Sequence, residues 1–197
     1  GRVLDALEEK GLADNTIVVF TSDHGYLLGH HHKFQKQHLF EEATRVPFII
    51  SVPWLKDQHG RGTTKITELV DLYPTLAELA SLPAPDTLQG TSLKPLLVDT
   101  ESSSWKKDQA FTISRSGGES IRTMDYRFTQ WGFGENGSEL YDLKKDPGEF
   151  TNQANNPEYA AVVKMLRAQL IAKRDAAGFK QNQAAIVGKP GKGKQKK

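Results

Sequence analysis

A short apolar run that breaks abruptly into polar residues constrains the fold of this chain more than any other feature. Residues Ile17 to Phe20 read Ile-Val-Val-Phe, a β-branched and aromatic run typical of a buried strand. The polar residues Thr21 to Gly25 follow at once, and a second apolar run spans Val46 to Ile50. Open α/β sheets carry their functional side chains at the carboxyl ends of such strands. The pattern predicts an α/β fold with a candidate site directly after Phe20.

Helical periodicity surrounds these two strands. Apolar residues recur at helical spacing over residues 3–7 and 69–80, and Gly11 stands where the cap of the first helix is expected. A second helix is expected to begin near Pro74, and short helical turns are expected at 40–45 and 92–97. Helices that alternate with strands are typical of a doubly wound, mostly parallel sheet. We therefore expect an α/β domain over residues 1–103.

The sequence changes character after residue 103. Four short strand-like runs, at 110–114, 120–124, 126–133 and 139–142, are separated by turn signals, of which Asn136-Gly137 is a strong hairpin signal. A helical stripe then runs from Val162 to about Ala177, where Gly178 provides a stop. We expect a small antiparallel sheet with a helix over residues 104–179. Residues 180–197 are rich in Gln, Gly, Pro and Lys and predict a disordered basic tail.

The composition excludes several classes of function. The net charge of +2 comes largely from the lysines of the last nine residues, so no general basic field predicts nucleic-acid binding. No apolar run approaches the ~18 residues that a membrane span requires. The chain has no cysteine, which rules out disulfides, thiolate metal sites and cysteine nucleophiles within it. It begins with Gly1 and shows no signal-peptide pattern, so we expect a fragment or a processed chain.

Two neighbouring residues, Asp23 and His24, are the first candidates for chemistry. A carboxylate and an imidazole displayed at a strand end suit a divalent cation, although Asp23 could instead cap a turn while His24 packs locally. Lys36 lies thirteen residues beyond Asp23. Its ammonium could stabilise negative charge on a sulfuryl or phosphoryl oxygen, and the alternative is a solvated surface lysine.

Five of the six histidines lie within the fifteen residues from His24 to His38. The run His30-His31-His32 has three interpretations that remain open: a cluster that contacts substrate, an adventitious transition-metal site, or a polar loop. Tyr26 follows the Asp-His pair closely, and it either lines a pocket or packs against the loop.

Several segments, in order, resemble the second half of the sulfatase family within the alkaline-phosphatase-like superfamily, and most closely its iduronate-2-sulfatase and choline-sulfatase-like branch. The similarity extends from Gly1 to about Gly178. The segments that carry it are Thr21-Ser22-Asp23-His24-Gly25-Tyr26, Leu28-Gly29, Lys36, Leu39-Phe40-Glu41-Glu42, Thr44-Arg45-Val46-Pro47, residues 67–76, residues 88–93, Glu139-Leu140-Tyr141-Asp142-Leu143 and Asp146-Pro147-Gly148-Glu149.

The resemblance implies specific roles. Asp23 and His24 would complete a Ca²⁺ site, Lys36 would bind the sulfate oxygens, and two further acidic ligands would come from an Asp-Asp segment near the family's N-terminus. The family's nucleophile is a formylglycine made from Cys in Cys-x-Pro-x-Arg, or from Ser in related motifs. The nearest serine candidate, Ser51 to Leu55, has Leu55 where arginine is required, so the formylglycine is absent from this chain. The resemblance therefore implies a C-terminal part that lacks half of the active site.

One local departure concerns the histidine run. The family often shows Glu-His-Gly where this chain has His30-His31-His32, so His31 matches and its two neighbours do not. The resemblance leaves His31 and Tyr26 as the candidates for substrate binding.

The leading hypothesis is the C-terminal region of a sulfuric ester hydrolase that acts on a sulfated carbohydrate or a small sulfate ester, with a missing N-terminal half as a partner. One alternative is a non-catalytic module that binds sulfated glycans or a complementary chain. Another is a phosphonate or phosphodiester hydrolase of the same superfamily. The resemblance also implies export to the periplasm, the extracellular space or the lysosome.

Overall fold

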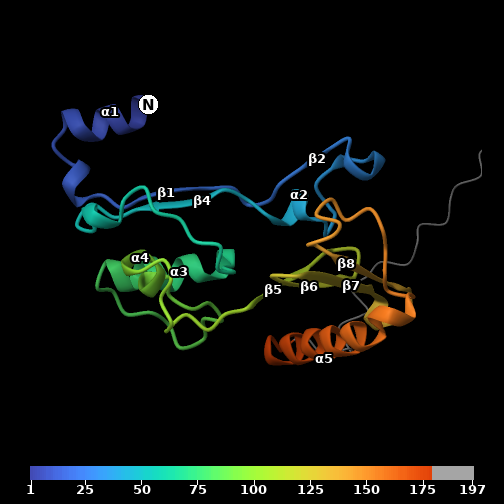
Figure 1. Cartoon of the computed structure of the whole chain (residues 1–197). Coiled ribbons are helices and arrows are strands. Elements are labelled where there is room, and N and C mark those ends of the chain that lie inside the picture. Colours follow the sequence, from blue (N-terminus) through green and yellow to red (C-terminus); the bar gives the residue numbers. More distant parts are fainter. Residues whose placement is uncertain (179–197) are drawn as a thin grey trace, which may run out of the picture. The chain divides into compact units, whose positions relative to one another are not determined.

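A computed structural model describes residues 1–178 of the protein, which form two compact units (Figure 1). Unit 1 comprises residues 1–25 and 45–108, and unit 2 comprises residues 26–44 together with the chain from 109 onward. The predicted division near residue 103 lies close to the second junction, but the segment 26–44 joins the C-terminal unit. The three predicted domains stay a prediction, and the predicted basic tail, 180–197, lies outside the described residues.

Unit 1 contains a two-stranded ribbon. Strand β1 (Val18–Thr21) pairs with β4 (Phe48–Ser51) in antiparallel register, with Phe20 opposite Ile49. The expectation of a parallel arrangement was wrong for this pair. Parallel neighbours need a crossover connection, usually a helix, whereas the chain between β1 and β4 holds only short strands and turns.

Only one face of this ribbon is covered within unit 1. Phe48 and Ile50 pack against a cluster of Leu93, Leu96 and Trp105. On the opposite face the cross-strand partners Phe20 and Ile49 are 61% and 60% exposed. The prediction of a buried strand was therefore wrong for β1, whose residues are partly buried or exposed, because only one face of the ribbon is covered.

Three helices complete unit 1: α1 (Arg2–Glu9), α3 (Leu72–Leu79) and α4 (Lys94–Val98). Helix α1 ends at Gly11, whose φ of 65° is the left-handed conformation predicted for a cap. Helix α3 begins at Leu72, so Pro74 lies in its first turn, where its missing N–H is tolerated.

A buried ion cluster fixes the entry to α3. Lys107 Nζ lies 2.6 Å from both Asp71 Oδ1 and Glu68 Oε2, and Asp71 is fully buried. The other Asp71 oxygen accepts the backbone N–H of Glu68, while Oδ1 also accepts that of Thr91. Both carboxylate oxygens therefore have hydrogen-bond partners, which is the condition for burying a carboxylate.

Unit 2 is built on a four-stranded antiparallel sheet of order β5-β6-β7-β8. The strands are β5 (Gln109–Ile113), β6 (Gly118–Thr123), β7 (Tyr126–Trp131) and β8 (Ser138–Asp142), close to the four predicted runs. The β7–β8 connection, which contains Asn136-Gly137, is longer than a two-residue hairpin, because a short 3-10 turn at Gly132–Gly134 precedes it.

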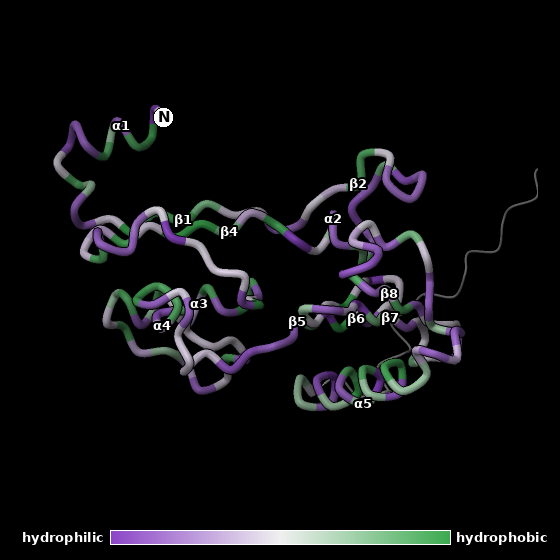
Figure 2. Tube along the Cα trace, in the orientation of Figure 1, coloured by the Kyte–Doolittle hydropathy of each residue, from purple (hydrophilic) through white to green (hydrophobic). Residues whose placement is uncertain are grey.

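Helix α5 (Ala160–Ala176) packs on this sheet, as Figure 1 shows. The core between them contains Ile121, Phe128, Leu140, Tyr159, Leu166 and Leu170, all at most 9% exposed. Figure 2 shows hydrophobic and hydrophilic residues alternating along α5, as expected for a helix with one buried face. Gly178, with a φ of 72°, follows the helix as predicted.

The segment 26–44 contributes the remaining elements of unit 2. These are the short antiparallel strands β2 (Leu27–Leu28) and β3 (Phe34–Gln35) and the single helical turn α2 (Glu41–Thr44). Across residues 1–178, the structure contains no helix with the length and apolar character needed to cross a bilayer.

Candidate functional site

The turn after β1 presents Asp23 and His24 in a defined geometry. Ser22 Oγ donates to the His24 carbonyl at 2.8 Å, and the Asp23 carboxylate accepts the His24 N–H at 3.1 Å. The imidazole Nδ1 of His24 lies 2.8 Å from the carbonyl oxygen of Gly25. A carbonyl only accepts, so this bond assigns the proton to Nδ1 and leaves the lone pair of Nε2 free in the neutral ring.

That arrangement fits part of a divalent-cation site. His24 Nε2 is 3.5 Å from Asp23 Oδ2, and the Asp23 side chain is 84% exposed. A metal-ligating histidine usually donates its other N–H to a carbonyl or carboxylate, as His24 does here. Ca²⁺ takes 6–8 oxygen ligands, however, and no group of three or more His, Asp or Glu side chains in residues 1–178 could hold a metal ion. A Ca²⁺ ion at this turn would therefore need ligands beyond Asp23 and His24.

His31 is held in an unusual conformation. Its φ is 51° and that of His32 is 55°, left-handed values that are uncommon for residues other than glycine. The His31 ring stacks on Phe40 with centroids 3.8 Å apart and 7° between the planes, and Phe150 lies 5.1 Å away. His31 Nε2 is buried and has no hydrogen-bond partner within the described chain. A buried polar atom without a partner is a place where a ligand can bond.

The neighbouring histidines have protein partners. His30 Nδ1 forms a short contact with Glu42 Oε1. Burial acts to raise the pKa of Glu42, but the hydrogen bond from His30, a backbone hydrogen bond and the nearby His30 and His31 together outweigh it and lower that pKa. Burial, together with nearby Lys33 and His31, lowers the pKa of His38, and Gln35 Nε2 lies 2.6 Å from its Nε2. Of the run His30-His31-His32, His30 is therefore part of a polar, hydrogen-bonded loop, and the interpretation of the run as a whole stays open.

Tyr26 and Lys36 lie on the same hairpin as His31. The Tyr26 hydroxyl donates to the carbonyl of Phe34 at 3.1 Å, and the residue is 48% exposed. Lys36 follows β3 directly and is exposed. Tyr26, His31 and Lys36 thus belong to unit 2, whereas Asp23 and His24 belong to unit 1. The predicted roles of these five residues stay predictions.

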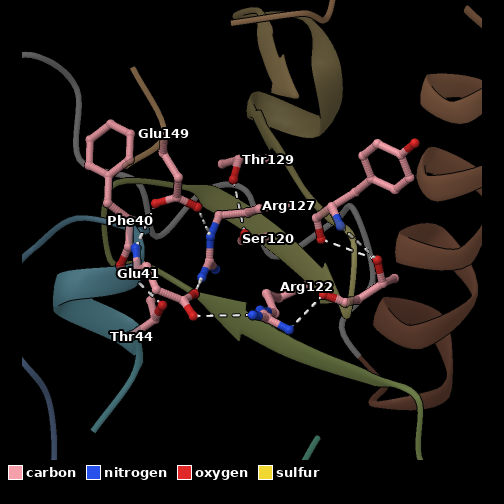
Figure 3. Close-up of polar contacts among 10 residues, drawn as sticks. Phe40, Glu41, Thr44, Ser120, Arg122, Arg127, Thr129 and Glu149 are labelled. Atoms are coloured by element: carbon pink, nitrogen blue, oxygen red, sulfur yellow. Dashed lines mark hydrogen bonds and ion pairs between the residues drawn. The ribbon is translucent and has the colours of Figure 1, made fainter. Parts of the chain in front are cut away.

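A buried ion network anchors this segment to the sheet (Figure 3). Arg127 on β7 donates from Nε to Glu149 Oε1 at 2.5 Å and from its terminal nitrogen to Glu41. The second Glu149 oxygen accepts the Glu41 N–H at 2.7 Å, and Arg122 lies 3.3 Å from Glu41. Burial raises the pKa of Glu149, although Arg127 and the Glu41 N–H oppose that shift.

No sequence pattern predicted this ion network. Two segments that carry the family resemblance, Leu39 to Glu42 and Asp146 to Glu149, were recognised only as similar. The structure brings them together through Arg127, which lies within a predicted strand and has no sequence signal of its own. Phe40 was also missed, and its signal is its position directly before Glu41, within the same segment.

The comparisons with known proteins agree with these observations. A profile described as N-sulphoglucosamine sulphohydrolase, C-terminal, matches residues 29–176. The chain belongs to this sulfatase family. An arylsulfatase of Clostridium perfringens is 36% identical over an alignment of 197 positions, which covers 96% of this chain and 40% of that protein.

Solved structures of sulfatase relatives resemble this chain closely. A structure of BT4656 in complex with its substrate D-glucosamine-2-N,6-O-disulfate has a TM-score of 0.80 at 31% identity, covering 96% of this chain and 39% of that one. A phosphonate monoester hydrolase of Agrobacterium radiobacter has a TM-score of 0.80 at 29% identity, with 90% and 38% covered. This sulfatase-family chain therefore spans about 40% of the length of these relatives.

Proposed function

We propose that this chain supplies the charge-stabilising part of a sulfuric ester hydrolase site. In this proposal Asp23 and His24 hold a divalent cation, Lys36 binds the sulfate oxygens, and Tyr26 and His31 contact the substrate. The observation that carries the proposal is the hydrogen bond from His24 Nδ1 to the Gly25 carbonyl, which directs the Nε2 lone pair to the side of the Asp23 carboxylate.

The chemistry follows from charge. Attack on a sulfate ester places negative charge on the sulfuryl oxygens and on the departing alcohol. A compact ammonium such as that of Lys36 stabilises this charge, and a bound Ca²⁺ would supply Lewis-acid stabilisation of developing negative charge. His31 Nε2, which has no partner among residues 1–178, is available for one hydrogen bond with a substrate hydroxyl, as donor or acceptor according to the tautomer of the ring.

The nucleophile is not among these residues. The chain has no cysteine, and Ser51 to Leu55 lacks the arginine of the formylglycine motif. We expect a protein of these 197 residues to bind ligand without turning it over, and a complementary N-terminal segment to supply the missing nucleophile and the other metal ligands.

The substrate class is a sulfated carbohydrate. Support comes from the neighbour solved with a disulfated glucosamine, and from the exposed lysine and aromatic side chains of the hairpin. We also propose that the protein is exported to the periplasm, the extracellular space or the lysosome, as the family resemblance implies. The similarity to a phosphonate monoester hydrolase supports a second candidate, hydrolysis of phosphonate esters at the same site.

Two titrations followed by NMR test the proposal. Mn²⁺, a paramagnetic probe that reveals weak sites, should broaden the signals of Asp23 and His24 first, and Ca²⁺ should compete. Asp23→Asn should weaken this broadening at least tenfold, whereas the control Asp14→Asn, on an 86% exposed side chain, should not change it. Broadening that is unchanged in Asp23→Asn would refute the metal assignment.

The second titration uses inorganic sulfate and phenylphosphonate. Sulfate should shift the Lys36 signals in the wild type, and the shift should disappear in Lys36→Ala. Tighter binding of phenylphosphonate than of phenyl sulfate at the same residues would favour the second candidate. Finally, aryl sulfate hydrolysis by the purified chain that Lys36→Ala abolishes would show that the prediction of an inactive chain is wrong.

A further inference from the structure

The β2–β3 hairpin exposes a compact apolar surface made by three side chains. Leu28 is 75% exposed, Phe34 is 72% exposed and Tyr26 is 48% exposed. Large apolar side chains left this open on a soluble protein, and rimmed by polar groups, mark interaction sites. In Figure 2 the hydrophobic stretch at β2 adjoins a hydrophilic loop.

The strand register places these side chains on one face. Leu28 pairs with Phe34, and Leu27 pairs with Gln35. Directly opposed residues of an antiparallel pair share a face, and successive residues alternate between faces. Leu27 is fully buried, so its face points into unit 2 and the face of Leu28 and Phe34 points to solvent. By the same alternation Tyr26, two residues before Leu28, lies on the outer face.

Contacts within the hairpin hold the exposed side chains of this surface in place. The Tyr26 hydroxyl bonds to the Phe34 carbonyl, which fixes the two aromatic residues relative to each other. Gly29 has a φ of 108°, and a β-carbon there would lie 3.6 Å from Phe34 Cζ, so the turn passes close beside the ring. His31, stacked on Phe40, holds the far end of the loop.

The charged side chains within the loop are of one sign, and the nearby Glu42 carboxylate is already paired with His30. Residues 29–38 contain two lysines, Lys33 and Lys36, and four histidines, but no aspartate or glutamate. An anionic ligand is therefore attracted to this loop, and one with an apolar face gains contact with the exposed rings.

We propose that Tyr26, Leu28 and Phe34 form a stacking platform for the apolar face of a sugar ring that carries a sulfate held by Lys36. The proposal rests on the sulfate-binding role of Lys36, and it adds Phe34 and Leu28 as residues that determine specificity for sulfated sugars over small alkyl sulfates. A sulfated sugar combines the two features that this hairpin complements, an anionic group and a flat array of C–H groups.

A protein partner fits this surface less well. A standard protein interface buries about 800 Å² on each partner. One fully buried aromatic side chain contributes about 150–250 Å². Three partly exposed side chains fall well short of the interface value, but they match the area of a single sugar ring.

The test is an NMR titration of the full chain with D-glucosamine-2-N,6-O-disulfate, inorganic sulfate and unsulfated glucosamine. The disulfate should shift Leu28 and Phe34 together with Lys36, whereas inorganic sulfate should shift Lys36 without Phe34. Phe34→Ala should weaken disulfate binding about tenfold and leave sulfate binding unchanged, and Phe34→Tyr should restore it. Trp54→Ala, at a 52% exposed aromatic residue in unit 1, is the matched control and should bind like the wild type.

The outcomes separate the two proposals. If Lys36 responds to the disulfate but Phe34→Ala binds it with unchanged affinity, the platform is refuted and the sulfate site stands. If Phe34 responds to the disulfate while Lys36 responds to neither anion, the sulfate site fails and the platform remains a saccharide surface. If Phe34→Ala changes only self-association, measured by sedimentation velocity, the surface binds protein and the platform is refuted. Circular dichroism of Phe34→Ala should match the wild type, because an exposed ring contributes little to stability.

Discussion

Arg127 and Glu149 form a buried ion pair with an Nε–Oε1 distance of 2.5 Å, in which both side chains are at most 3% exposed. The same Glu149 carboxylate accepts the backbone N–H of Glu41, 108 residues earlier in the chain. Arg127 also reaches the side chain of Glu41, so one guanidinium serves two carboxylates. This connection ties the start of α2, and with it the segment that carries Lys36, to the middle of the sheet.

Replacing Arg127 with methionine should destabilise the chain by about 3 kcal/mol, because it removes the counter-charge of the buried Glu149 carboxylate and leaves only Arg122 beside Glu41. Urea unfolding at pH 7 measures the change. The loss should shrink toward pH 4, since Glu149, whose pKa is already raised by burial, is then protonated in the folded variant. Arg115→Met, at an exposed arginine before β6, is the control and should cost under about 0.5 kcal/mol. Equal losses in the two variants would contradict this prediction.

Asp142 should contribute a pH-dependent part of the stability. Burial acts to raise its pKa, but hydrogen bonds from the Tyr159 hydroxyl and the Lys144 and Lys145 N–H groups outweigh it, so the pKa is lowered below the ordinary value of 3.8. A carboxyl with a lowered folded-state pKa stabilises the fold above its unfolded value and loses that effect as pH falls through the folded value.

Asp142→Asn should therefore be less stable than the wild type at pH 7 by about 1–2 kcal/mol, the range for a lost charge-assisted hydrogen bond. The difference should narrow as pH falls below 3.8, where the wild-type carboxyl also becomes neutral. Denaturant unfolding at pH 7, 5 and 3 measures it. A difference that stays constant across this range would show that the charge of Asp142 is not the cause.

Gly90 lies against the backbone before α3. A β-carbon at this position would meet the Val70 carbonyl oxygen at 2.0 Å and the Asp71 Cα at 3.0 Å. Backbone atoms cannot move aside as a flexible side chain can, so Gly90→Ala should cost about 3 kcal/mol or more. Gly62→Ala is the matched control, because a β-carbon there has nothing within 4 Å, and it should change stability by under about 0.5 kcal/mol. Thermal unfolding of the two variants measures the difference. A Gly90→Ala protein as stable as the wild type would mean that Gly90 does not lie against the Val70 carbonyl.

Local patterns predicted most of the elements. The four strands of unit 2, helix α5 and the cap at Gly11 follow from side-chain periodicity and glycine positions, which depend on neighbours along the chain. The direction of β4 relative to β1 cannot be predicted in this way, because an apolar run has the same pattern in a parallel and in an antiparallel pair. The sequence order of helices and strands favoured a parallel pair. The pairing of Phe20 with Ile49 is antiparallel.

The candidate site divides in the same way. Asp23, His24 and Lys36 have chemically reactive side chains at informative positions, so both spacing and resemblance found them. The network of Arg127, Glu41 and Glu149 joins residues far apart in sequence, and only the folded sheet brings them together. No sequence pattern singled out Phe34, because its exposure is a property of the hairpin's outer face.

The exposed face of the β1–β4 ribbon should make the isolated chain self-associate. Phe20 and Ile49 are direct cross-strand partners and are both about 60% exposed, and the ribbon has only two strands, so within residues 1–178 its outer edges are unpaired. Exposed apolar strands with free edges pair with other chains.

Sedimentation velocity should show association of the wild type that increases with concentration. The double variant Phe20→Thr with Ile49→Lys should shift it toward monomer without lowering the melting temperature, because neither side chain packs in a core. Leu82→Lys, at a 62% exposed leucine outside the ribbon, should leave association unchanged. A wild type that stays monomeric at every concentration would mean that this apolar face does not drive association of the chain.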